Sequence, residues 1–268
     1  MSSACSPVRS NWRLGTLLGL ACALVLSGCR HRSAQLPPPQ QLPPPAQPAY
    51  VPPPEHSEAA PPEHIPITPV PPGGVSADDL DYVATHRPIA TQTGVATWYT
   101  APYRGRRAAN GQVFDDRALT AAHRTLPMGS LVVVTNLQTG QSSVMRIADR
   151  GPFVDGRVID LTIASAKATG VYRVGLARVR IDVYETPKPI KTGGRWCVQI
   201  GAFHDARAAM RLKAQLERQY AGANVIEFAG EHSYWVRIRP EGDARSMAEY
   251  IARHVHPSEG DAFLTRLD

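Results

Sequence analysis

Residues 131–147 read LVVVTNLQTGQSSVMRI, and this stretch decides how the middle of the chain folds. The segments 131–135 and 142–147 contain β-branched side chains, which favour strands. Between them lies the sequence QTG at 138–140, which is typical of a tight turn between antiparallel strands. We therefore expect a β-hairpin here.

Further strands are expected on both sides of the hairpin. Residues 94–99 (GVATWY) form one such run, and at 178–183 apolar residues alternate with charged ones, as in a strand with one buried face. Between these regions Thr162 can cap a short helix that ends at Thr169. Several short strands with one small helix predict a compact, mostly β domain, a barrel, over residues 92–186.

A second domain is expected over residues 194–268, after a linker at 187–193. Helices should begin after Asp205 and at Asp243, because apolar residues then recur at steps of three and four. The expected strands are at residues 196–202, 224–228, 234–238 and 262–267. The order βαββαβ predicts a small α+β domain of the ferredoxin-like type.

The first 28 residues have the features of a secretory signal. Arg9 and Arg13 precede an apolar run at 14–26, which is too short to cross a bilayer as a helix. The run ends in the sequence LSGC and resembles a bacterial lipobox, which implies lipidation of Cys29 and a membrane anchor. Residue 30 is Arg rather than Asp, which in Gram-negative lipoproteins implies an outer-membrane location facing the periplasm.

Residues 29–91 are expected to be the lipidated cysteine and a disordered tether. Within them, residues 36–74 hold 16 of the 25 prolines and almost no apolar periodicity, so this segment cannot bury a core. An extended polyproline chain of this length could reach roughly 120 Å at about 3.1 Å per residue. A spacer from a membrane fits this reach, although a linker without such a role would have the same composition.

Charge and cysteine content exclude several classes of function. Without Arg9 and Arg13 the chain keeps 27 basic and 23 acidic side chains, a weak basic excess that suits an anionic polymer. No basic run or basic-aromatic block indicates nucleic-acid binding. Cys197 is the one cysteine in the expected folded part, so the sequence offers no disulfide framework and no Cys/His metal cluster. We expect no metal and no cofactor.

Short motifs of the first domain resemble, as a set and in their order, the rare lipoprotein A family of septal lytic transglycosylases. This resemblance implies a double-psi β-barrel, a fold that expansins share. It also implies endolytic cleavage of stem-peptide-free glycan strands at the division septum, with 1,6-anhydromuramic acid ends as products. The motifs are GVATWY (94–99), ANG (109–111), LTAAH (119–123), LPMG (126–129), VTNL (134–137), DRGPF (149–153) and IDL (159–161).

The chemistry of such an enzyme sets what its site must contain. Cleavage of a glycosidic bond needs an acid that protonates the leaving oxygen, and stabilisation of an oxocarbenium-like centre. In a lytic transglycosylase the 6-hydroxyl of the sugar attacks, so one carboxyl group can serve first as acid and then as base. That carboxyl group needs a pKa raised by burial or by a nearby like charge.

Asp149 is the leading candidate for this acid, because it lies where a strand ends in a Gly-Pro turn. An aspartate that only fixes the turn is the alternative. Asp115 and His123 match an acidic and a histidine position of the family groove, with a loop carboxylate and a buried core histidine as alternatives. We expect these three side chains to line one groove. Asp160 is expected to cap the following helix, and Asp155 to be solvated.

Gln112 departs from the family pattern, which often has Glu after Asn-Gly or Ser-Gly. An amide cannot titrate, so Gln112 either binds sugar hydroxyls at the edge of the groove or marks a weakened activity. The departure keeps a second function open: a non-catalytic, expansin-like lipoprotein that binds peptidoglycan.

The second domain resembles SPOR domains in its strands WCVQIGAF (196–203) and YWVRI (234–238). The resemblance implies binding of stem-peptide-free glycan strands at division septa, where other septal proteins are further expected partners. Alternation along the strands places Gln199, Trp235 and Arg237 on the face away from the helices. We expect these three side chains to be exposed and to bind glycan, with an ordinary sheet surface as the alternative.

Overall fold

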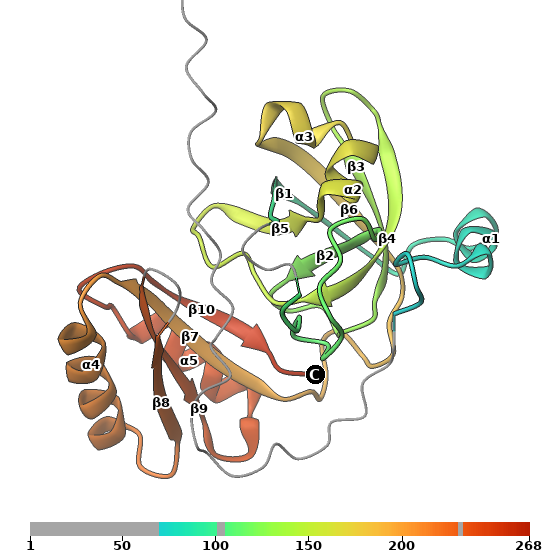
Figure 1. Ribbon diagram of the computed structural model, residues 1–268. Coiled ribbons are helices and arrows are strands. Elements are labelled where there is room, and N and C mark those ends of the chain that lie inside the picture. The colour runs from blue at the N-terminus through green and yellow to red at the C-terminus, as the bar shows by residue number, and fades with distance from the viewer. Residues whose placement is uncertain (1–69, 101–104, 230–232) are drawn as a thin grey trace, which may run out of the picture. The chain divides into compact units, whose positions relative to one another are not determined.

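The structure is a computed structural model that describes residues 70–268 except 101–104 and 230–232 (Figure 1). The expected signal sequence, Cys29 and most of the proline-rich segment lie outside the described residues. All described residues belong to one compact unit, Pro43–Asp268.

Six strands form a closed barrel, in agreement with the expected mostly β domain. Around the barrel the order is β1-β5-β2-β4-β3-β6, and β6 pairs with β1 to close it. The β1–β5 and β2–β4 pairs are parallel, and the others are antiparallel. The strands are β1 (Ala90–Trp98), β2 (Thr120–His123), β3 (Leu131–Asn136), β4 (Ser142–Asp149), β5 (Arg157–Leu161) and β6 (Ala177–Glu185).

Apolar side chains at alternating strand positions fill the barrel. In β6, Val179, Ile181 and Val183 are buried in the core, whereas Arg178 and Arg180 are exposed. This is the alternation that the sequence predicts for a strand with one buried face. Residues of all six strands join the same core, which therefore holds the strand ends in fixed places.

The predicted hairpin is confirmed. Strands β3 and β4 pair from Leu131 with Arg146 to Thr135 with Ser142, and Gly140 takes a positive φ of 74° in the turn. Two short strands, β2 and β5, were not expected. All four residues of β2 are buried, so its sequence TAAH shows no alternation that could reveal a strand.

Two short helices follow β5, namely α2 (Ile163–Ala168) and α3 (Val171–Val174). The hydroxyl of Thr162 accepts a hydrogen bond from the Ser165 N–H, which makes Thr162 the N-cap of α2 as predicted. Asp160 is not the cap. Its carboxylate accepts a hydrogen bond from the Thr97 hydroxyl of β1 instead.

A helix that the sequence did not predict, α1 (Ala77–Thr85), precedes the barrel. Ser76 and Asp79 form a capping box, and Asp79 pairs with Arg146 of β4 at 2.5 Å. Figure 1 shows α1 beside β4, outside the barrel. The structure therefore differs from the expected disordered tether at 29–91, because a capped helix and the start of β1 fall within its last residues.

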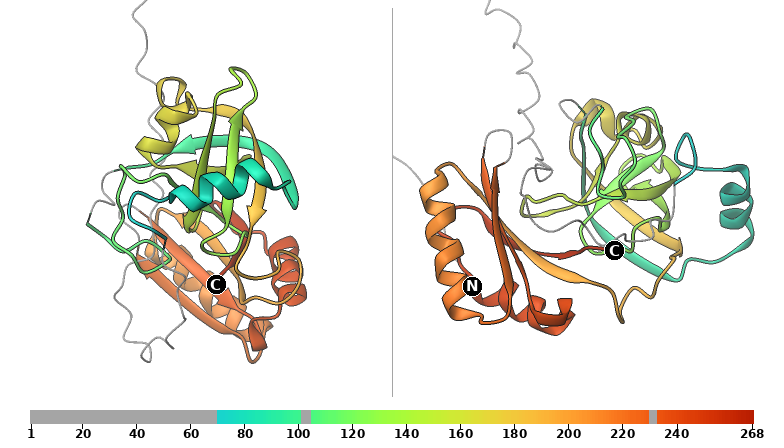
Figure 2. Two further views of the ribbon diagram at one scale, coloured as in Figure 1. Left: turned by 90° about the vertical axis from the view of Figure 1, so that its right-hand side faces the viewer. Right: turned by 60° about the horizontal axis from the view of Figure 1, so that its bottom comes forward.

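The second domain has the predicted βαββαβ order. Its sheet is antiparallel with the order β10-β7-β9-β8, and both long helices cover one face (Figure 2). Asp205 caps α4 as expected, while α5 begins two residues after Asp243. The elements are β7 (Trp196–Phe203), α4 (Ala206–Gln219), β8 (Asn224–Ala229), β9 (Tyr234–Arg239), a 3-10 turn (Glu241–Asp243), α5 (Arg245–His254) and β10 (Asp261–Arg266).

Within the described part of the chain, no helix has the length and apolar character to cross a membrane.

Candidate functional site

Asp149 ends β4 and is almost fully buried, with 3% of its surface exposed. Its Oδ1 accepts hydrogen bonds from the backbone N–H groups of Ala109 (2.9 Å) and Arg150 (2.8 Å). Burial raises the pKa of Asp149 to about 6, although both N–H donors and the Arg150 cation act in the opposite direction. The carboxyl group can therefore hold a proton near neutral pH, as an acid in glycan cleavage must.

A second buried carboxylate, Asp160, lies close to Asp149 in the barrel. Strand β2 runs between β4 and β5, and Ala122 pairs with Asp149 on one side and with Asp160 on the other. Asp160 is 4% exposed, and burial raises its pKa to about 6, against the hydrogen bond from Thr97. The Asp160 charge also contributes to the raised pKa of Asp149.

The role that the sequence gave to Asp160 is wrong, because Thr162 caps α2. Helix-start rules favour an Asp just before a helix, and they hid a carboxylate that faces a neighbouring strand. The signal that could have found it is the sequence RVIDL, in which the aspartate has apolar residues on both sides. The structure shows that Ile159 to Leu161 are all buried.

His123, at the end of β2, is 3% exposed and uses both ring nitrogens. Nδ1 accepts hydrogen bonds from the N–H groups of Thr125 (3.1 Å) and Leu126 (3.0 Å), so the ring proton is assigned to Nε2, 3.1 Å from Oε1 of Gln92. Burial lowers the pKa of His123 to about 3, with help from the Arg124 and Arg150 cations. His123 is therefore neutral at ordinary pH and orients this end of β2.

Arg150, next to Asp149, connects several parts of the chain. Its guanidinium donates to the carbonyl oxygens of His123 (3.0 Å), Arg266 (2.5 Å) and Asp268 (2.8 Å). Only 6% of the residue is exposed. These bonds fix the turn that follows Asp149.

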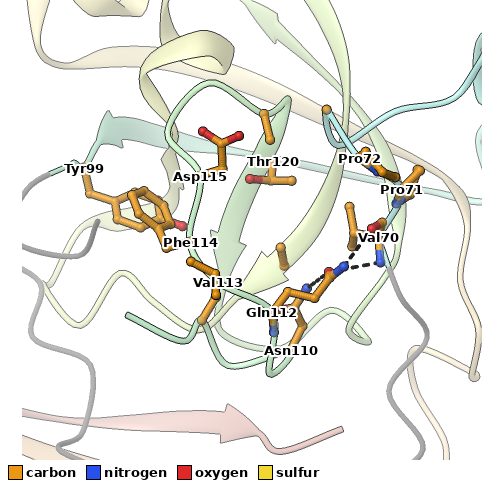
Figure 3. A pocket seen from close by; sticks show the side chains of 14 residues that line it. Val70, Pro71, Pro72, Tyr99, Asn110, Gln112, Val113, Phe114, Asp115 and Thr120 are labelled. Atoms are coloured by element: carbon orange, nitrogen blue, oxygen red, sulfur yellow. Dashed lines mark hydrogen bonds between the residues drawn. The ribbon is translucent and has the colours of Figure 1, made fainter. Parts of the chain in front are cut away.

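A cavity of about 160 Å³ lies beside this region (Figure 3). Asp115 and Gln112 belong to its lining, whereas Asp149 and His123 do not. The structure thus differs from the expectation that Asp115, His123 and Asp149 line one groove. The Asp115 side chain is half exposed, and its Oδ1 lies 3.5 Å from Nε of Arg117. The lining residues are Val70, Pro71, Pro72, Gly73, Tyr99, Ala108, Asn110, Gln112, Val113, Phe114, Asp115, Ala118, Thr120 and Ala148.

Gln112 belongs to the lining of this cavity, and its side-chain amide bonds with the protein's own backbone. Its Nε2 donates to the Val70 carbonyl oxygen (2.9 Å), and its Oε1 accepts from the Val70 N–H (3.1 Å). The same Oε1 accepts from Nδ2 of Asn110 at 2.6 Å.

The three expected glycan-binding side chains of the second domain share one sheet face, opposite the helices. The expectation that they are exposed is wrong for two of them, because Gln199 is fully buried and Trp235 is 3% exposed. The Trp235 ring lies 5.7 Å from the Phe153 ring, and Arg237, which is partly exposed, donates to Oε1 of Gln199 at 2.8 Å. Strand alternation alone predicts that this sheet face is exposed, but the contact between Trp235 and Phe153 covers part of it.

Comparison with known proteins matches both domains. Residues 91–181 match the family described as lytic transglycolase, and residues 192–264 match the SPOR domain. The endolytic peptidoglycan transglycosylase RlpA of Neisseria meningitidis serogroup A is 34% identical over 169 residues, which cover 61% of this chain and 71% of the relative. This chain belongs to the RlpA family. Its closed barrel is the double-psi barrel that the motifs implied.

Other members of the RlpA family match shorter regions. The probable RlpA of Synechocystis is 54% identical over 106 residues, which cover 40% of this chain and 32% of the relative. RlpA of Vibrio cholerae is 48% identical over 101 residues, 38% of each chain. The chain thus spans about a third of the length of these two relatives.

Among solved structures, the Streptomyces papain inhibitor is 21% identical, with 37% of this chain and 97% of that chain covered. An expansin of Clavibacter michiganensis is 14% identical, with 66% and 90% covered. Both have a TM-score of 0.31, which is too low to bear on function.

The proximity of the two buried carboxylates yields a prediction. Asp160→Asn removes a negative charge near Asp149, so the pKa of Asp149 should fall below about 6, while burial, the largest cause of the shift, keeps it above the ordinary value of about 3.9 for Asp. Carboxyl chemical shifts followed by NMR titration would measure this pKa. Asp182→Asn is the control, because Asp182 is a buried aspartate on β6, which does not pair with β4. An unchanged pKa in Asp160→Asn would show that the two carboxylates do not interact.

Proposed function

We propose that this protein is an endolytic peptidoglycan lytic transglycosylase that cleaves stem-peptide-free glycan strands into products with 1,6-anhydromuramic acid ends. The observation that carries the proposal is the position of Asp149, which is buried at the end of β4 directly after Ala148 of the cavity lining. Its raised pKa of about 6 suits a group that must give and then take a proton. Membership of a family whose curated relatives are named endolytic peptidoglycan transglycosylases supports it.

In the proposed reaction Asp149 donates its proton to the oxygen of the glycosidic bond, which breaks as positive charge develops at C1. The resulting carboxylate then takes the proton of the sugar's 6-hydroxyl, whose oxygen bonds to C1. Asp149 ends the cycle protonated, and no water is consumed. Asp160 acts through its charge, which favours the protonated form of Asp149 before the reaction.

Asp149→Asn should abolish the release of 1,6-anhydro products, because the amide has nearly the same shape but cannot donate the acid proton. General acid catalysis contributes on the order of 10²–10⁴-fold, so a loss of that size is expected. Mass analysis of products from stem-peptide-free sacculi measures it. Asp115→Asn is the matched control, because Asp115 is half exposed and outside the buried carboxylate pair; it should reduce the rate less.

Two outcomes would contradict this proposal. If Asp149→Asn cleaves normally, Asp149 is not the acid. If the wild-type protein binds glycan strands and releases no anhydro ends, the non-catalytic, expansin-like function is the correct one. The amide at Gln112 favours that second function, since it cannot titrate.

We also propose that the SPOR-like domain directs the protein to stem-peptide-free glycan at division septa. Gln199 Nε2 and Arg237 Nε are buried and have no hydrogen-bond partner among the described residues. The sheet face that carries Gln199 and Arg237 therefore holds two donors that could bond with a ligand. Trp235 lies on the same face, but its ring is 3% exposed and packs against Phe153, so it supports this face from below and does not stack on a sugar.

Arg237→Ala should weaken septal enrichment of a fluorescent fusion of the whole protein, because it removes a donor from this face. Arg211→Ala is the control, since Arg211 is an exposed arginine on α4, which packs on the other face of the sheet. Fluorescence microscopy of dividing cells measures the enrichment. Equal enrichment of Arg237→Ala and wild type would remove this face from the proposed binding surface.

The third proposal is a lipid anchor on Cys29 in the outer membrane, facing the periplasm, carried by the LSGC sequence. Cys29→Ala should yield an unacylated protein that leaves the membrane fraction, because acyl chains supply the binding energy of such an anchor. Cys22→Ala is the matched control. Membrane fractionation with metabolic labelling by a palmitate analogue measures both; wild-type labelling of Cys29→Ala would contradict the anchor.

A further inference from the structure

Residues 70–74 (VPPGG), which we name the strap, run along the cavity beside Gln112 (Figure 3). Val70 and the next three residues belong to the cavity lining, and Val70 is only 5% exposed. The strap therefore covers part of a cavity on the barrel with the chain's own backbone.

The contact between Gln112 and Val70 uses both functional groups of the side-chain amide. One donates to the Val70 carbonyl oxygen and the other accepts from the Val70 N–H, as a neighbouring β-strand would. A glutamate at position 112 could accept the N–H but would place a second acceptor oxygen against the carbonyl. The amide thus fits the strap where a carboxylate would repel it.

The two ends of the strap are held differently. At its C-terminal end the Gly73 carbonyl accepts from the Leu119 N–H (2.8 Å), and the Gly74 N–H closes a turn to Pro71 (2.8 Å). Gly74 has a φ of 91°, and a side chain there would collide with the Leu119 backbone. Helix α1 follows at once and is fixed by Asp79. At the N-terminal end, both backbone groups of Val70 bond with Gln112. Release of Gln112 would therefore let the strap swing out about Gly74, and this movement would also break the bond between the Gly73 carbonyl and the Leu119 N–H.

The cavity beneath the strap suits a sugar. Tyr99 and Phe114 offer aromatic surface, with ring centroids 4.9 Å apart, beside polar Asp115 and Thr120. Such a mixture of aromatic side chains and a few polar groups is typical of small-molecule sites. The cavity also adjoins the candidate acid, because Ala148, which precedes Asp149, belongs to the lining.

We propose that the strap is an intramolecular cover held by Gln112, and that a glycan strand enters this cavity by displacing Val70. The displaced strap frees the Gln112 amide to bond with hydroxyl or acetamido groups of the sugar. Substrate and strap then compete for the same side chain, so the covered form is the less active one. This inference rests on the proposed function for the identity of its ligand.

The test weakens the strap without altering the cavity wall on the barrel. Val70→Asp, made in the whole protein, places a carboxylate at a buried position and should expel the strap. Leu80→Asp is the matched control, because it adds the same group at an exposed site on α1. Hydrogen exchange of the Leu119 amide reports whether the strap is seated, since this amide donates to Gly73. The release of 1,6-anhydro ends from stem-peptide-free glycan strands reports activity.

We expect Val70→Asp to speed Leu119 exchange and to raise product release roughly tenfold, because each neutral hydrogen bond that holds the strap contributes about two- to tenfold to its seating. Leu80→Asp should change neither. Glycan strands added to the Asp149→Asn variant should also speed Leu119 exchange. If Val70→Asp does not fold, Val70→Gly takes its place under the same criteria.

Two results would overturn the cover. The first is a strap variant in which the Leu119 amide exchanges faster but which cleaves no faster than an active wild-type protein. The second is Leu119 exchange that stays unchanged or becomes slower when glycan strands are added to Asp149→Asn. The proposed function fails separately. If no variant releases anhydro ends but glycan still speeds Leu119 exchange, the cover stands and the transglycosylase proposal is rejected.

Discussion

The pairing of β2 on both of its edges is the constraint on which the candidate site depends. This strand has four residues, all buried, and lies between β4 and β5 in the closed barrel. Because Ala122 pairs with Asp149 on one side and with Asp160 on the other, the ladder sets the separation of two carboxylates that come from distant parts of the sequence. Each carboxylate also accepts a hydrogen bond from outside β2, Asp160 from the Thr97 hydroxyl of β1 and Asp149 from the Ala109 N–H.

The burial of these two carboxylates makes the stability of the folded protein depend on pH over a defined range. Asp149 and Asp160 have folded-state pKa values of about 6, above the unfolded value of about 3.9, so the folded protein binds more protons between these limits. Their contribution to stability therefore falls as the pH rises from about 4 to about 6. His123 acts in the opposite sense, because its folded pKa of about 3 lies below the unfolded value of about 6.5, so stability falls as the pH drops through this range. Between about pH 4 and pH 6 the folded barrel thus favours protonated Asp149 and Asp160 and a neutral His123.

Features that depend on local patterns could be predicted from the sequence. Alternation identified β6, the turn at Gly140 identified the β3–β4 hairpin, and Thr162 and Asp205 were predicted as helix caps from their own positions. Features that depend on distant partners could not. Strand β2 has no exposed face to produce alternation, and the hydrogen-bond partner of Asp160 is Thr97 on another strand. Trp235 lies on the predicted sheet face, but its exposure depends on Phe153, which no pattern within β9 can indicate.

Gln112 shows how a local departure acquires meaning from a distant partner. In the sequence it is only an amide where the family often has a carboxylate, and this weakens the case for catalysis. In the structure the amide pairs with the backbone of Val70, a contact that uses a donor which glutamate does not have. The same substitution that removes a titratable group from position 112 thereby gives the chain a donor that bonds with the strap, residues 70–74. In the proposed reaction, proton transfer depends on the buried carboxylates beside β2, and in the proposed cover position 112 controls access to the cavity next to them.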